Sequence, residues 1–98
     1  MPLETAHIGV LYVELFSPMS GSLTSKRSVL KSVKDRIRSQ FNVSVAEIGE
    51  QDKWQRSVIG VCALSSDKTY LDQCLQNILS FFDGVHDIQL IQHQIEFL

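Results

Sequence analysis

The sequence predicts an α+β domain whose elements follow the order β-α-β-β-α-β. Segments with strand periodicity and segments with helix periodicity alternate in this order, and turns rich in Pro, Gly or Ser separate them. The chain has 98 residues, of which 44% are hydrophobic and 20% charged. This composition is that of a globular protein, and the length predicts one domain over residues 1–98.

The first half of the chain predicts a strand, a helix and a second strand. Residues 6–16 are almost continuously apolar and rich in β-branched and aromatic types, as in a strand covered on both faces. A loop containing Pro18 and Gly21 follows, and apolar residues then recur at helical intervals over 24–40. Residues 42–50 alternate between polar and apolar types, which predicts a strand with one solvated face.

The second half predicts a turn, a strand, a helix and a last strand. A second apolar strand is expected over 56–65. Asp67 is a suitable N-cap for the following helix, and Gly84 stands where a helix would end. Residues 85–98 then alternate as a strand does.

This order and length favour the ferredoxin-like fold, a four-stranded antiparallel sheet with two helices on one face. In that topology the first and third strands lie in the middle of the sheet, and they are the most continuously apolar here. The second and fourth strands alternate, as edge strands do.

Composition also limits the functional classes. No apolar stretch approaches the roughly 20 residues that span a bilayer, and no signal peptide is readable at the amino terminus. Cys62 and Cys74 have no metal or redox spacing, which fits free thiols in the cytoplasm. His7, His86 and His93 share no ligand spacing, so we expect neither a metal nor a cofactor.

The charge is segregated although the net charge is only −2. The predicted first helix carries six of the nine cationic residues and one acid, a local charge of +5, and the rest of the chain sums to −7. Four of the cations fall on one side of a helical wheel, namely Arg27, Lys31, Lys34 and Arg38. Such a stripe covers about 16 Å and could contact several backbone phosphates, although charged helix faces are often simply solvated.

The start of the same helix is a second candidate site. Ser22, Thr24, Lys26 and Arg27 place hydroxyls and cations at a helix N-terminus, where free N–H groups favour an anion. The glycine that precedes the lysine of a Walker loop is absent. The alternative is that Ser22 or Thr24 only caps the helix.

Trp54, the single tryptophan, lies in the predicted hairpin between Lys53 and Arg56. A tryptophan among cations can stack on a base or anchor a partner protein. The alternative is that the indole folds back over the open end of the core.

Three segments carry a family resemblance: residues 22–31, residues 41–47 (FNVSVAE) and residues 52–56 (DKWQR). In these segments the chain resembles the YlxP-like family of small bacterial proteins without an assigned biochemical function. Thr24 and Ser25 depart from the family pattern, which tends to have charged residues there. The resemblance implies a ferredoxin-like fold and, from the neighbourhood of ribosome-maturation and translation-initiation genes, an association with RNA or the ribosome.

We therefore expect a non-catalytic protein that binds RNA or a ribosomal subunit, with no membrane partner. The expected contacts are Ser22, Thr24, Lys26, Arg27, Lys31, Lys34, Arg38, Trp54 and Arg56. One alternative is a regulatory module on the same fold that binds a small ligand or forms a homodimer through an edge strand. An enzyme is the least favoured alternative, because an acylphosphatase would need a glycine-rich phosphate loop that is absent.

Overall fold

The computed structural model describes residues 3–98 and contains six elements in the predicted order. These are β1 (His7–Phe16), α1 (Leu23–Gln40), β2 (Ser44–Gly49), β3 (Arg56–Ser65), α2 (Lys68–Asp83) and β4 (Gln89–Phe97). The strands form one antiparallel sheet in the order β2-β3-β1-β4. The ferredoxin-like α+β prediction is thus confirmed.

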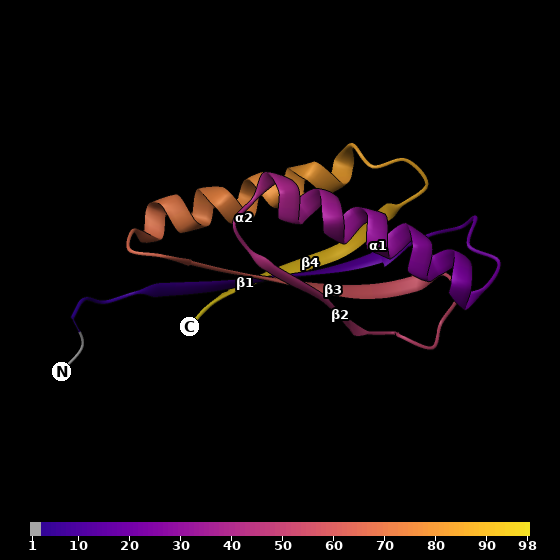
Figure 1. Ribbon diagram of the computed structural model, residues 1–98, viewed down its shortest axis with the longest axis horizontal. Helices are drawn as coiled ribbons and strands as arrows, with labels where there is room; N and C mark the ends of the chain where they lie inside the picture. The colour runs from indigo at the N-terminus through magenta and orange to yellow at the C-terminus, as the bar shows by residue number, and fades with distance from the viewer. Residues whose placement is uncertain (1–2) are drawn as a thin grey trace.

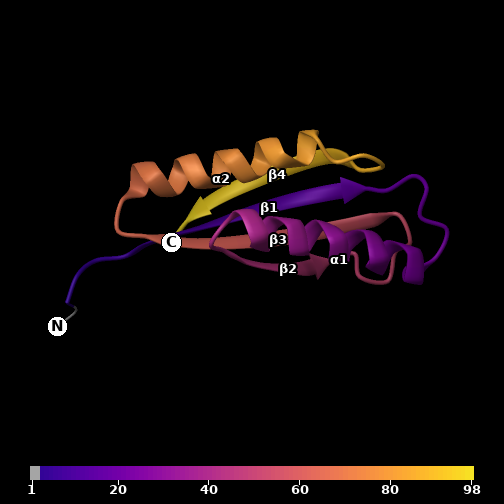
Figure 2. The same ribbon diagram turned by 45° about the horizontal axis from the view of Figure 1, so that its top comes forward.

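Both helices lie on the same face of the sheet (Figure 1). Helix α2 packs over β1, β3 and β4, whereas α1 packs against β2 (Figure 2). Leu11 and Val13 of β1 face Val61 and Ile59 of β3, and all four are completely buried beneath the helices. Helix α2 approaches β1 closely at Gly9, where an added Cβ atom would lie 2.8 Å from a Leu75 methyl group and one of the two would have to shift.

Two strand predictions need correction. Burial in β1 alternates between buried and half-buried residues, so the strand is covered on one face and not on both. The long apolar run predicted two covered faces, but half of its side chains are sheltered only by neighbouring strands. The last strand begins at Gln89 instead of residue 85, because Val85 and Ile88 are buried in the loop that precedes it.

Candidate nucleic-acid interface

Ser22 forms the N-cap of α1. Its hydroxyl accepts a hydrogen bond from the backbone N–H of Ser25 at 3.1 Å, while Thr24 is exposed in the first turn. Ser22 therefore caps the helix, as the alternative interpretation of this residue predicted. Because Ser22 occupies one of the free N–H groups, the start of α1 offers fewer donors to an anion than the sequence predicted.

Lys26 is not available to a ligand. The residue is 1% exposed, and its Nζ donates to the backbone carbonyls of Glu50 and Lys53, the latter at 2.7 Å. Glu47 Oε2, which has no hydrogen-bond partner, lies 2.9 Å from the same Nζ in an electrostatic contact. The prediction that Lys26 presents a surface cation is wrong, because β2 and the turn after it enclose the ammonium group.

A signal for this burial exists in the sequence. Lys26 precedes Leu30, Val33 and Ile37 by four, seven and eleven residues, so it lies on the inward stripe of α1. A cation on that stripe must either reach the surface or be paired. Lys26 is paired, and it ties the turn between β2 and β3 to the first turn of α1.

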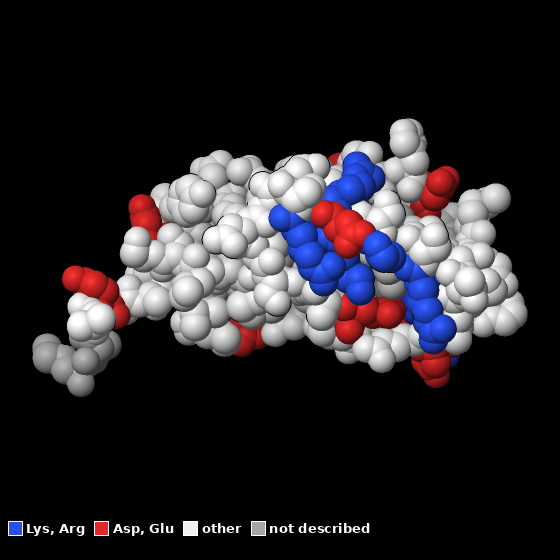
Figure 3. Space-filling view, in the orientation of Figure 1, with Lys and Arg blue, Asp and Glu red and all other residues white. Residues whose placement is uncertain are grey.

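The other cations of α1 lie at the surface. Arg27, Lys31, Arg36 and Arg38 are exposed, and Lys34 is half-buried. Figure 3 shows them as a band of basic side chains across the helix, with acidic side chains at its centre and below it. These five cations and Asp35 sum to +4.

Asp35 neutralises part of this band. Its carboxylate pairs with Lys31 at 2.8 Å and with Arg38 at 3.5 Å. The hydrogen bond from Lys31, reinforced by the charges of Lys31, Arg38 and Lys34, holds the pKa of Asp35 below its ordinary value. Both ion pairs are exposed to solvent, where such pairs contribute little stability, so Lys31 and Arg38 can exchange Asp35 for another anion.

Two guanidinium groups have contacts that the sequence did not indicate. Arg38 Nη2 donates to the carbonyl of Val45 in β2 at 3.1 Å. Arg36 lies over the ring of Phe81, with its Cζ 5.0 Å from the centroid. Arg36 was outside the predicted stripe, and only the packing of α2 beside α1 brings Phe81 beneath it.

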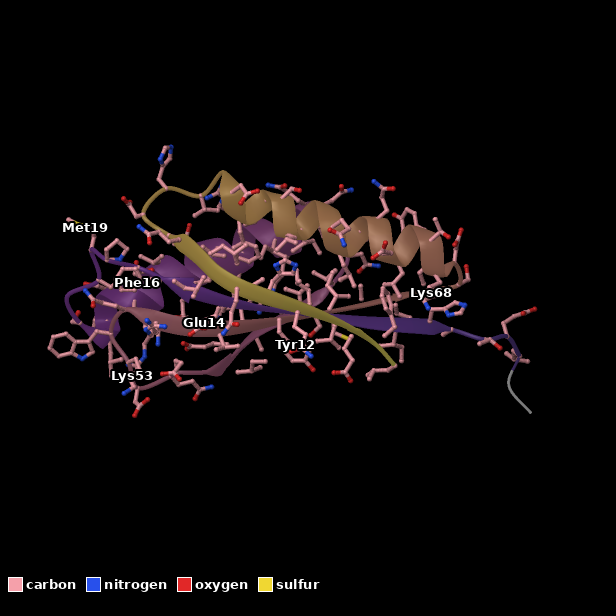
Figure 4. All side chains as sticks on the ribbon, turned by 180° about the vertical axis from the view of Figure 1, so that it is seen from behind. Tyr12, Glu14, Phe16, Met19, Lys53 and Lys68 are labelled. Atoms are coloured by element: carbon pink, nitrogen blue, oxygen red, sulfur yellow. The ribbon has the colours of Figure 1, made fainter. Side chains whose placement is uncertain are left out.

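Trp54 is 57% exposed, so it does not fold back over the core. It borders a shallow hollow together with Phe16, Gly21 and Lys53. Figure 4 shows Phe16, Met19 and Lys53 at one end of the molecule.

Hydrogen bonds hold the two loops at this end together. The N–H of Ser17 donates to the carbonyl of Gln55 at 2.7 Å, and the Gln55 side chain donates to the carbonyl of Pro18 at 3.0 Å. Because Lys26 also binds the Lys53 carbonyl, Trp54 is held near the start of α1.

Arg56 does not join the basic band of α1. It begins β3 on the face of the sheet opposite the helices, where its Nη1 lies 3.1 Å from Glu14 Oε2. The second oxygen of Glu14 accepts a hydrogen bond from Gln92 at 2.7 Å. The predicted contact residues therefore lie on two faces of the molecule, because Arg56 belongs to a polar network on the open face of the sheet.

Other predicted features are placed as follows. Among residues 3–98, no three His, Cys, Asp or Glu side chains are grouped to hold a metal ion. Cys62 is exposed on β3, and partial burial raises the pKa of the Cys74 thiol. Neither helix within these residues is long and apolar enough to cross a membrane.

Comparisons with known proteins assign no activity to the chain. A family model described as "Protein of unknown function (DUF503)" matches residues 8–95. The chain is 42% identical over 82 residues to "Uncharacterized protein YlxP" of Bacillus subtilis (strain 168), covering 84% of this chain and 89% of that protein. Among solved structures, the de novo designed protein Foldit4 is similar, with a TM-score of 0.55, 12% identity and coverage of 94% and 96%.

Proposed function

Because the chain belongs to the DUF503 family, whose function is unknown, we propose a function from its own surface: it binds structured RNA through α1. The observation that carries the proposal is the band of five accessible cations on one helix of an acidic molecule. The net charge without this helix is −7, so the field of the protein orients a polyanion toward α1.

The cations of α1 have the geometry that phosphate contacts need. Arg27, Lys31, Lys34 and Arg38 repeat at three- and four-residue intervals, which places them along one side of the helix over about 16 Å. Arg27 and Lys34 have no ion-pair partner among residues 3–98. Lys31 and the Nη1 group of Arg38 pair only with a solvent-exposed carboxylate, while Nη2 of Arg38 remains bound to the Val45 carbonyl.

Trp54 supplies a contact of a different kind. Its exposed indole stands beside Lys53 and near the start of α1, so a nucleotide whose phosphate meets Arg27 can bring a base toward the ring. Stacking of a base on an aromatic side chain is worth about 1–3 kcal/mol. We therefore assign Trp54 to an unpaired base and α1 to the phosphates beside it.

Salt dependence separates this function from a merely solvated helix face. A fluorescent RNA hairpin with an unpaired loop is titrated with the protein from 50 to 200 mM salt. Three to four phosphate contacts predict a slope of about −3 in log affinity against log salt, which is a loss of about 60-fold over this range. Affinity that is independent of salt would refute the proposal.

Matched variants locate the contact. Lys34→Glu should weaken binding about tenfold and reduce the slope by about one or more, whereas Lys68→Glu makes the same charge change on α2 and should have a much smaller effect. Trp54→Ala should cost about 5- to 160-fold in affinity with little change in slope. Tyr70→Ala is its control, because Tyr70 is another exposed aromatic residue and lies on α2.

A further inference from the structure

The two edge strands of the sheet differ in whether side chains occupy their outward backbone groups. Strand β2 at one edge has six residues and an irregular register after Glu47. Its carbonyl groups at Val45 and Glu47 accept hydrogen bonds from the side chains of Arg38 at 3.1 Å and Gln51 at 3.0 Å. These side chains occupy the groups that a further strand would need, so the β2 edge is closed to pairing.

Strand β4 at the other edge is longer and unprotected. It has nine residues, and the N–H of Leu98 just after it donates to the carbonyl of Ile8 in β1 at 2.9 Å. Backbone groups alternate in direction along a strand, so those of His93, Ile95 and Phe97 point away from β1. Within residues 3–98, no hydrogen bond reaches these outward groups.

The composition of β4 is unusual for an edge that faces water. Its nine residues contain one charged side chain, Glu96, and no lysine or proline, which are the residues that commonly protect edges. Ile91 and Phe97 are 45% and 38% exposed. The register irregularity at Ile91 interrupts the strand, which leaves residues 93–97 as its regular part.

We propose that β4 pairs antiparallel with β4 of a second copy of this chain, with Ile95 on the twofold axis. In this register Ile95 faces Ile95 of the second copy, and His93 faces Phe97. Each of these facing pairs joins residues whose N–H and C=O groups are free, so each can form two hydrogen bonds. The register that pairs Ile95 with His93 of the second copy places Phe97 opposite the irregularity at Ile91.

A second copy suits this edge better than an unrelated strand because the register is self-complementary. Antiparallel pairing of one strand with itself is isologous and closes after two copies. On the helix face, His93 meets Phe97 of the second copy, since both residues pair with β1 positions that face the helices. On the open face Gln94 meets Glu96, so no two carboxylates face each other.

The resulting dimer has a continuous eight-stranded sheet. Because α1 lies toward β2, the far edge of each copy, the two basic bands would stand about 30 Å apart at strand spacings of about 4.8 Å. The dimer does not depend on RNA binding, and its test requires no RNA.

Sedimentation equilibrium on the purified chain tests the proposal. We expect a concentration-dependent dimer below about 500 µM, because a single strand pair forms a small interface of modest affinity. Gln94→Lys faces Glu96 of the second copy twice in each dimer and should tighten association about 2- to 30-fold, whereas Gln94→Glu should weaken it by a similar factor. Ala46→Glu is the control for Gln94→Glu: it places the same negative charge on the β2 edge and should leave the dissociation constant unchanged.

Amide hydrogen exchange identifies the paired edge independently of the variants. The amides of His93, Ile95 and Phe97 should exchange slowly in the dimer and rapidly on dilution. The proposal would be overturned if the chain stays monomeric at about 500 µM. It would also be overturned if the dissociation constant of both Gln94 variants equals that of the wild type. Dimer-dependent protection on α1 or on the open sheet face, with these three amides unprotected, would overturn it as well.

Discussion

Replacement of Lys26 by methionine should destabilise the domain by about 3 kcal/mol, near the lower end of the range for breaking a buried ion pair. Methionine keeps the length of the side chain and removes the charge. The substitution removes the Lys26 donor from the Lys53 carbonyl and one of the two donors from the Glu50 carbonyl, which also accepts from the N–H of Lys53. It also leaves the Glu47 carboxylate without its counter-ion. The lower end applies because Glu47 is 17% exposed, so water can hydrate part of its charge.

The measurement is urea unfolding followed by far-UV circular dichroism. Trp54 fluorescence is a poor probe here, because the indole is already exposed in the folded state. A loss of about 3 kcal/mol corresponds to a fall in Tm of about 12–24 °C in a domain of this size. If the single variant is too unstable to analyse, Lys26→Arg keeps the charge and should retain more of the stability.

Two comparisons show whether the ion pair is responsible. Lys34→Met changes a partly exposed lysine of the same helix and should alter stability by no more than about 0.5 kcal/mol. Combining Lys26→Met with Glu47→Gln removes both charges, so the double variant should lose at least about 1 kcal/mol less than the sum of the singles. A cost below about 1 kcal/mol for Lys26→Met would refute the role of Lys26 as the anchor of the β2–β3 turn.

Three further predictions follow from local geometry. Gly9→Ala should lower the free energy of unfolding by about 1–3 kcal/mol, because its Cβ would crowd Leu75. An unchanged Tm in thermal unfolding would contradict this, because it would show that α2 can shift away from β1 without loss of stability. Ser22→Ala should cost about 1 kcal/mol through loss of the α1 cap, whereas Ser28→Ala on an exposed turn should cost nothing, and equal effects would contradict the cap. Asp35→Asn should raise RNA affinity about fivefold, because it frees Lys31 and Arg38 from the carboxylate. In the wild type the ionised carboxylate stabilises the fold at pH values above its ordinary pKa, and this stability is lost as pH falls through the lowered pKa of the folded state. The Asn variant should therefore lack this acid-dependent loss of stability.

The alternation of periodic segments was sufficient to predict the six elements and their order. Strand and helix periods are local properties, and at this length the β-α-β-β-α-β order leaves few ways to bury both helices on one sheet. Helix α2 illustrates this: its cap at Asp67 and its end at Gly84 lie where the sequence predicted them. The charge concentrated on α1 is likewise a property of the sequence, as is the position of Lys26 on the inward stripe of that helix.

Only the tertiary structure decided which cations remain available. Lys26 is withdrawn because β2 brings Glu47 and two turn carbonyls to it, and Arg56 is withdrawn because it faces Glu14 across the sheet. The unequal edges arise in the same way, since Arg38 occupies a β2 carbonyl from the neighbouring helix, while no hydrogen bond among residues 3–98 reaches the outward backbone groups of β4. These outcomes depend on contacts between residues of different elements, and the local periods that predict each element do not specify its contact partners.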